Sequence, residues 1–140
     1  MMNCTRWRSS VTLVELMIAA SVLAIAGVML FLMFANCIIL NEYNRERTLA
    51  VSHAQYVLEE MKNNDFTTLS ANIGAGTWDW DEAGVQAQGL ASLDNEVVDA
   101  GVVDIGAAGT PLLDVTVTVT WDDRRGAARN IVLETIIAEP

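Results

Sequence analysis

An uncharged stretch near the amino terminus limits what this chain can fold into more than any other feature. Residues 16–40 form 25 consecutive positions without a charged side chain, and most of them are apolar. A helix needs about 20 apolar residues to cross the roughly 30 Å hydrocarbon core of a bilayer. The sequence therefore predicts a transmembrane helix.

This helix is expected to continue well beyond the uncharged stretch. No proline occurs between Val11 and Asn64, and Gly27 is the only glycine there, so the usual helix breakers are nearly absent. At 1.5 Å per residue such a helix would be about 80 Å long. Residues 41–65 would then form an outer half beyond the membrane, ending at a polar Asn-Asn-Asp cluster.

The outer half of the expected helix is apolar on one side only. Apolar residues recur at helical spacing along one stripe, and polar residues lie opposite. The stripe consists of Ala50, Ala54, Val57, Leu58 and Met61, and the polar face includes Ser52, Gln55, Glu59 and Lys62. We expect the rest of the protein to cover this stripe.

The carboxy-terminal segment, residues 97–140, carries strand signals. Apolar and polar residues alternate from Leu112 to Trp121, which is the pattern of a sheet with one buried face. A polar turn at residues 122–126 leads to a second strand at residues 129–138. A weaker strand, residues 97–105, comes before both, and we expect three antiparallel strands.

The intervening segment, residues 66–96, has weak periodicity and four glycines. It is predicted as a long connecting loop with at most a short helical turn. The predicted fold class is therefore α+β, with a long amino-terminal helix packed on a small antiparallel sheet of about three strands.

A single acidic residue interrupts the start of the apolar region. The chain reads Ser10-Val11-Thr12-Leu13-Val14-Glu15 just before the uncharged stretch, and two arginines precede this motif. A carboxylate at the centre of a transmembrane helix costs about 2.5–3.5 kcal/mol on insertion scales. Such a residue usually has a partner, so Glu15 is the first candidate functional residue.

The motif resembles the amino terminus of type IV prepilins and type II secretion pseudoprepilins. Their pattern is glycine, then Phe-Thr-Leu, any residue, Glu and about twenty apolar residues; here Ser10 replaces the glycine and Val11 the phenylalanine. The resemblance implies a leader peptide at residues 1–10, cleavage by a prepilin peptidase between Ser10 and Val11, and N-methylation of Val11. It also implies that Thr12, Leu13 and Glu15 act in assembly.

In that family the glutamate faces the amino-terminal ammonium of a neighbouring subunit. The resemblance therefore implies a pilin-like fold with a polymerisation helix at residues 11–40, and partners that include other subunits and an inner-membrane assembly platform. It also implies a cytoplasmic amino terminus, a carboxy-terminal domain outside the inner membrane, and later incorporation into a filament.

The function expected is that of a minor pilin or pseudopilin, a structural subunit of a type IV pilus or a type II secretion pseudopilus. The alternative is a membrane-anchored binding protein that never polymerises. The residues do not distinguish a pilus from a secretion pseudopilus.

An ordinary secretory signal peptide is a second reading of the amino terminus. Two arginines form a basic region, and Ala24-Ile25-Ala26 has the form of a signal peptidase site. Against it, Glu15 falls inside the apolar region, and cleavage there would leave the apolar residues 27–40 on a secreted protein. The arginines give no orientation, because two before the span are matched by two just after it.

Charge argues against nucleic acid as a partner. The formal net charge is −10, and removal of the leader with its two arginines would make it −12. Binding to a phosphate backbone requires clustered Lys and Arg. Arg124, Arg125 and Arg129 come closest to a cluster, and they are expected to form a solvated turn.

No residue pattern points to catalysis, a cofactor or a disulfide. His53 is the only histidine and is expected to be a partly buried helix residue. Asp79, Asp81 and Glu82 are weak calcium candidates, because their spacing does not fit an EF-hand loop. Their alternative role is to face water while two neighbouring tryptophans cover the sheet or a neighbouring subunit. We expect no enzymatic activity and no cofactor.

Overall fold

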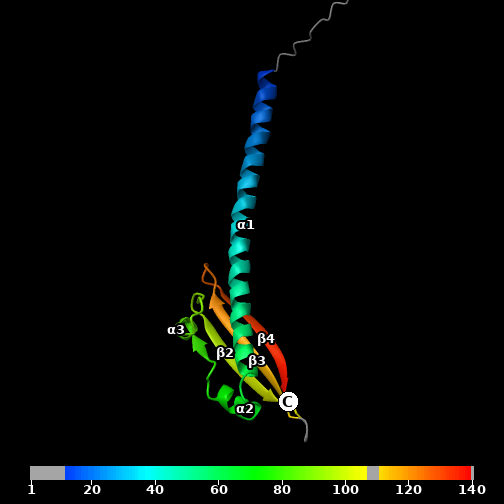
Figure 1. Ribbon diagram of the computed structural model, residues 1–140. Helices are drawn as coiled ribbons and strands as arrows, with labels where there is room; N and C mark the ends of the chain where they lie inside the picture. Colours follow the sequence, from blue (N-terminus) through cyan, green and yellow to red (C-terminus); the bar gives the residue numbers. More distant parts are fainter. Residues whose placement is uncertain (1–11, 107–110, 140) are drawn as a thin grey trace, which may run out of the picture. The chain divides into compact units, whose positions relative to one another are not determined.

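The structure, a computed structural model, describes residues 12–106 and 111–139. The chain divides into two units, residues 1–41 and residues 42–140. Figure 1 labels the elements, which in chain order are α1 (Leu13–Lys62), α2 (Phe66–Gly74), β1 (Trp80–Asp81), α3 (Glu82–Ala87), β2 (Val97–Asp104), β3 (Leu112–Asp122) and β4 (Ala128–Ala138). The fold is α+β, as the sequence predicts.

Helix α1 is uninterrupted over 50 residues, about 75 Å at 1.5 Å per residue. It ends at Lys62, close to the predicted polar cluster. Asp65 of that cluster caps α2: its Oδ1 accepts hydrogen bonds from the Thr67 backbone N at 3.0 Å and from the Thr67 hydroxyl at 2.9 Å. These two hydrogen bonds lower the pKa of Asp65 below its ordinary value of 3.8.

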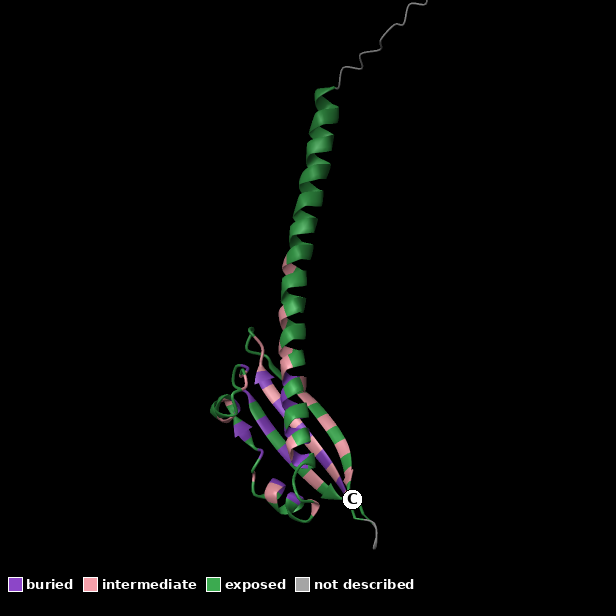
Figure 2. Cartoon of the chain, viewed as in Figure 1, coloured by how far each residue is buried: buried purple, intermediate pink, exposed green. Residues whose placement is uncertain are grey.

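The described part of the first unit is the apolar portion of α1. Its large apolar side chains range from 42% exposed at Ile39 to 77% exposed at Leu13. Figure 2 shows this portion of the helix almost entirely in the colour of exposed residues. No element of its own unit in the described part of the chain covers this surface.

The second unit is built on one antiparallel sheet with the strand order β1-β2-β3-β4. Strand β3 lies between two long neighbours and pairs with β2 over eight positions and with β4 over eleven. Its side chains alternate strictly between buried and half-buried, which confirms the predicted period of two. The buried set is Leu113, Val115, Val117, Val119 and Trp121.

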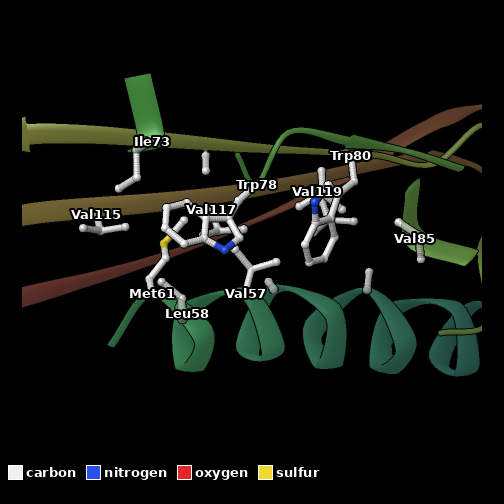
Figure 3. Close-up of a cluster of buried hydrophobic side chains, with 14 of the residues drawn as sticks. Val57, Leu58, Met61, Ile73, Trp78, Trp80, Val85, Val115, Val117 and Val119 are labelled. Carbon is white, nitrogen blue, oxygen red and sulfur yellow. The ribbon is translucent and has the colours of Figure 1, made fainter. Parts of the chain in front are cut away.

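The core lies between the sheet and the outer half of α1. Figure 3 shows Val57, Leu58 and Met61 of the helix directed toward Val115 and Val117 of β3. All five predicted stripe residues are buried, with exposed fractions between 0% and 8%. The amphipathic pattern therefore predicted the buried face of α1 correctly.

Residues 66–96 are more ordered than the predicted loop with one helical turn. They contain helices α2 and α3 and strand β1, which adds a fourth strand to the sheet. The cause is two buried tryptophans: Trp78 is 2% and Trp80 9% exposed, and both lie between α1 and the sheet (Figure 3). The predicted covering of the sheet by these tryptophans is confirmed.

One glycine makes the approach to these tryptophans possible. Gly76 has a φ of 73°, in the left-handed region that only glycine adopts readily. A Cβ at this position would lie 2.9 Å from Oδ2 of Asp79. The turn between α2 and β1 therefore requires glycine.

Candidate functional site

The candidate site lies at the first turn of α1, where Thr12 caps the helix. The Thr12 hydroxyl oxygen accepts a hydrogen bond from the backbone N of Glu15 at 3.3 Å, and the Thr12 carbonyl accepts one from Leu16 N at 3.2 Å. Ser/Thr-x-x-Glu is the spacing of a capping box. Thr12 thus has a structural role in starting the helix, which sequence reasoning missed although the spacing shows it.

The side chain of Glu15 is exposed and forms no hydrogen bond or ion pair with the described residues. Its position in the first turn is favourable, because the helix dipole stabilises a negative charge there by about 0.3–1 kcal/mol. That is smaller than the cost of about 2.5–3.5 kcal/mol for a carboxylate deep in a membrane. Within lipid or an apolar bundle, Glu15 therefore needs a positive partner from outside this chain's described residues.

The residues that flank Glu15 on α1 after Thr12 are apolar. Leu13 is 77%, Val14 64% and Leu16 64% exposed, so this turn of the helix is a largely apolar surface. In the described residues, α1 is the one helix long and apolar enough to cross a membrane. A helix of this kind is stable when lipid or other helices cover it.

The predicted cleavage and methylation positions, Ser10 and Val11, lie outside the described residues. Thr12, Leu13 and Glu15 lie together at the start of α1. Cys37, near the other end of the apolar stretch, is an exposed free thiol.

A buried pair joins α1 to the segment before β2. His53 and Glu96 are each 1% exposed, and His53 Nδ1 lies 2.6 Å from Glu96 Oε1. The second oxygen of Glu96 accepts a hydrogen bond from Leu93 N at 2.7 Å. His53 is therefore fully buried, rather than partly buried as predicted. Glu96 was missed because nothing in its local sequence marks it as the partner of a residue 43 positions earlier.

The three calcium candidates each have a local hydrogen-bonding role. Asp79 accepts from Ala100 N at 3.1 Å and so ties its turn to β2. Asp81 caps α3 by accepting from Gly84 N at 2.8 Å, and Glu82 accepts from Gln86 at 3.4 Å. Across residues 12–106 and 111–139, no group of three or more His, Cys, Asp or Glu side chains could hold a metal ion. Calcium binding here stays an untested prediction.

The basic turn between β3 and β4 contacts the beginning of the second unit. Arg124 donates to Glu42 at 2.6 Å, and the Arg129 guanidinium lies 5.4 Å from the centre of the Tyr43 ring. Arg129 also pairs with Asp123 at 3.0 Å. The Ala127 backbone N–H and Arg129 hold the pKa of Asp123 below its ordinary value of 3.8. The three arginines are exposed as predicted, but the contacts of Arg124 and Arg129 with α1 were not foreseen.

The outer face of the sheet, opposite α1, carries a pair of carboxyl groups. Hydrogen bonding with Asp114 and repulsion by its negative charge raise the pKa of Glu134 above its ordinary value of 4.5. Asp114 Oδ1 is one of two buried side-chain polar atoms that have no hydrogen-bond partner in the described part.

Comparison with protein-family models, with characterised protein sequences and with solved structures gives no match to this chain. Its function is therefore inferred from the geometry of α1 and of the domain that packs on the outer half of that helix.

Proposed function

We propose that this chain is a structural subunit, a minor pilin or pseudopilin, of a type IV pilus or a type II secretion pseudopilus. It is made as a prepilin, cleaved between Ser10 and Val11 by a prepilin peptidase and N-methylated on Val11. Before assembly it resides in the inner membrane with its amino terminus in the cytoplasm, and it enters the filament through an inner-membrane assembly platform.

One observation carries this proposal: α1 begins with a carboxylate that has no partner in the described residues, and as far as residue 41 the helix is apolar and exposed on all sides. Lipid can cover the apolar surface, but it offers no positive group to the Glu15 carboxylate. A bundle of identical or related helices provides both an apolar cover and a positive group, because each subunit supplies an amino-terminal ammonium as well as a carboxylate. Glu15 lies four residues beyond Val11, about 6 Å along the helix axis. A neighbour displaced by that distance brings its amine level with the carboxylate.

The outer half of α1 supports the same reading. It is covered on one face by the sheet and by the tryptophans of residues 66–96, so the domain has its own core and leaves the apolar half free for other helices. Sequence resemblance in the motif and this division of the helix are the two independent supports.

The first test is mass spectrometry of the mature amino terminus, purified from membranes of cells that express the full chain with a prepilin peptidase. Methylated Val11 is the expected result. An intact Met1, or a start at Gly27, would instead favour the membrane-anchored binding protein or a removable signal peptide.

The second test replaces Glu15 with glutamine, which keeps the size of the side chain and removes its charge. Loss of one member of a buried ion pair costs about 3–5 kcal/mol, so filament yield should fall about a hundredfold or more while the protein remains in the membrane. Glu59→Gln is the matched control, because Glu59 is an exposed acid on the polar face of the same helix. Undiminished filament yield in Glu15→Gln would refute the proposal.

A further inference from the structure

The distribution of charge in the second unit is strongly uneven. Residues 42–140 contain six Lys or Arg residues and 17 Asp or Glu residues. Five of the six basic residues lie in two short segments, residues 42–47 and residues 122–129, which we call the arginine end. They are Arg45, Arg47, Arg124, Arg125 and Arg129.

Contacts within the unit bring these two segments together. Arg124 donates to Glu42 at 2.6 Å, and Arg129 lies over the ring of Tyr43 at 5.4 Å. The turn between β3 and β4 is thereby held against the first two residues of the unit. Sequence separation hid this cluster, since 82 positions separate Arg124 from Glu42.

The arginine end differs in charge from everything else in its unit. It contains five arginines and four carboxylates, so its formal charge is +1. The carboxylates are Glu42, Glu46, Asp122 and Asp123. The remaining residues of the unit carry Lys62 against 13 carboxylates, a formal charge of −12 with His53 neutral. Within the described residues Arg45, Arg47 and Arg125 are exposed and form no ion pair.

The arginine end also begins where the uncharged stretch stops. Arg45 and Arg47 follow Leu40 by five and seven residues on the same continuous helix, about 7 and 10 Å along its axis. The headgroup region of a bilayer extends about 5–8 Å beyond the hydrocarbon on each side. Long arginine side chains can reach back into that region while their stems cover apolar surface.

A hollow at the arginine end offers further hydrogen-bond donors. It measures about 500 Å³, and Tyr43, Arg47, Trp121 and Arg129 are among the residues that line it. Arg47 and Arg129 supply the exposed donors of this hollow; the Trp121 indole N–H also has no acceptor in the described part of the chain, but it is buried. Guanidinium groups suit phosphate oxygens because of their planar, forked geometry, and tyrosine and tryptophan are enriched at the headgroup level of membranes.

We propose that the arginine end is a docking surface for anionic phospholipid headgroups, which holds the domain on the membrane before the subunit leaves it. Each Lys or Arg near an anionic bilayer contributes attraction, while the acidic remainder of the unit is repelled, so the two effects select one orientation. This surface goes beyond the proposed function, because it requires a membrane span at residues 16–40 but neither cleavage nor polymerisation.

The test measures how close the turn between β3 and β4 lies to the membrane. The full-length chain, with Cys4 and Cys37 replaced by serine, is labelled with a fluorophore at Ala127→Cys and reconstituted into vesicles that contain a headgroup-labelled acceptor lipid. Vesicles of phosphatidylcholine alone are compared with vesicles that also contain phosphatidylglycerol. The span alone keeps this turn near the bilayer, so some energy transfer is expected in both. It should be higher with phosphatidylglycerol, and this difference should disappear at about 1 M salt, where the Debye length is about 3 Å.

A second label serves as the reference position. Ser70→Cys lies in α2. The first residue of α2, Phe66, lines a hollow together with Ala138. Ala138 is at the end of β4, about 30 Å along the strand from Arg129. Its energy transfer should stay low in both kinds of vesicle. Equal transfer from both labels would overturn the proposal, because it would mean that the domain has no preferred face.

Substitution of two arginines without ion pairs identifies the groups responsible. Each arginine near an anionic bilayer is expected to favour the docked state about fivefold. Arg47→Gln together with Arg125→Gln should therefore lower the ratio of docked to undocked domain by about thirty-fold. Asn63→Asp together with Ser70→Asp changes the net charge equally at exposed positions elsewhere and should leave the ratio unchanged. Circular dichroism of each variant checks that the domain remains folded.

Two further results would overturn the proposal. One is an unchanged ratio in the double arginine variant. The other is close approach of the Ala127 label in pure phosphatidylcholine that rises with protein density, which would identify the acidic part of a second copy as the partner. Neither result bears on methylation of Val11 or on the need for Glu15, so failure here is distinguishable from failure of the proposed function.

Discussion

The two parts of α1 belong to one continuous helix but relate differently to the protein around them. In residues 13–41 the apolar side chains lie on all sides and are exposed, whereas in residues 42–62 they form one stripe that is buried against the sheet. Figure 2 shows the change along the helix, with buried positions only in the outer part. Hydrophobicity alone therefore does not mark a core, because what counts is whether the same chain covers the apolar surface.

The acidic residues of the two units show the same contrast. Glu96 is buried and both of its oxygens have partners in its own unit, His53 and Leu93. The backbone N–H of Glu15 donates to the capping Thr12 hydroxyl, but the Glu15 carboxylate has no partner in the described residues. The buried acid Glu96 is thus satisfied within its own unit, whereas the carboxylate of Glu15 is not satisfied by any described residue.

The largest expected effect is on the free energy of unfolding, when a methionine in each part of α1 is replaced by alanine. Met61 is 0% and Met33 65% exposed. Met61→Ala should destabilise the domain by about 2–5 kcal/mol because it leaves a cavity in a packed core. Met33→Ala should leave the free energy of unfolding of the domain unchanged. Urea unfolding in detergent micelles, followed by tryptophan fluorescence, measures both, and equal losses would break the comparison.

The next effect contrasts the two glutamates. Glu96→Ala leaves two buried donors unpaired, the His53 ring and the Leu93 backbone N–H, at about 1–3 kcal/mol each, so we expect a loss of at least about 2 kcal/mol in the same unfolding experiment. Glu15→Ala should not change that free energy. If Glu96→Ala behaved like Glu15→Ala, the buried pair would contribute nothing to holding the segment before β2 on α1.

The smallest expected effect is a change in the pH dependence of stability, and it comes from the two carboxyl groups on the outer face of the sheet. It tests whether the second unit contains an unfavourable contact between like charges. The pKa of Glu134 is raised by Asp114, so between pH 4.5 and the raised pKa the folded state binds more protons than the unfolded state. Stability should therefore fall as the pH rises through this range. Glu134→Gln should remove that fall and raise the urea midpoint at about pH 7, with no gain below about pH 4.

A matched substitution on the same face controls for the loss of one negative charge. Asp99 is an exposed carboxylate of β2, and Asp99→Asn should leave the slope of stability against pH in place. Asp65 and Asp123 have lowered pKa values, so they stabilise the folded state above their ordinary pKa of 3.8. That stability is lost as the pH falls toward and below this value. The two ranges can therefore be separated in one pH series.

Several features of the fold were predictable because they depend on local pattern. The absence of proline predicted one long helix, and helical spacing identified its buried stripe at Ala50, Ala54, Val57, Leu58 and Met61. The period of two predicted β3 within one residue at its end. Periodicity is visible in sequence because a helix or strand repeats its environment at fixed intervals.

Other features depend on contacts between distant positions, and local pattern carries no sign of them. Residues 66–96 form two helices and an edge strand because Trp78 and Trp80 are inserted between α1 and the sheet. The Glu96 partner of His53 became visible only once the segment before β2 lay against the helix. The sequence by itself determined a long helix that begins with an uncompensated acid, and an alternating sheet to cover its outer half. Only the tertiary structure decided which distant charges meet, because folding sets the distance between residues far apart in the chain, and electrostatic attraction depends on that distance.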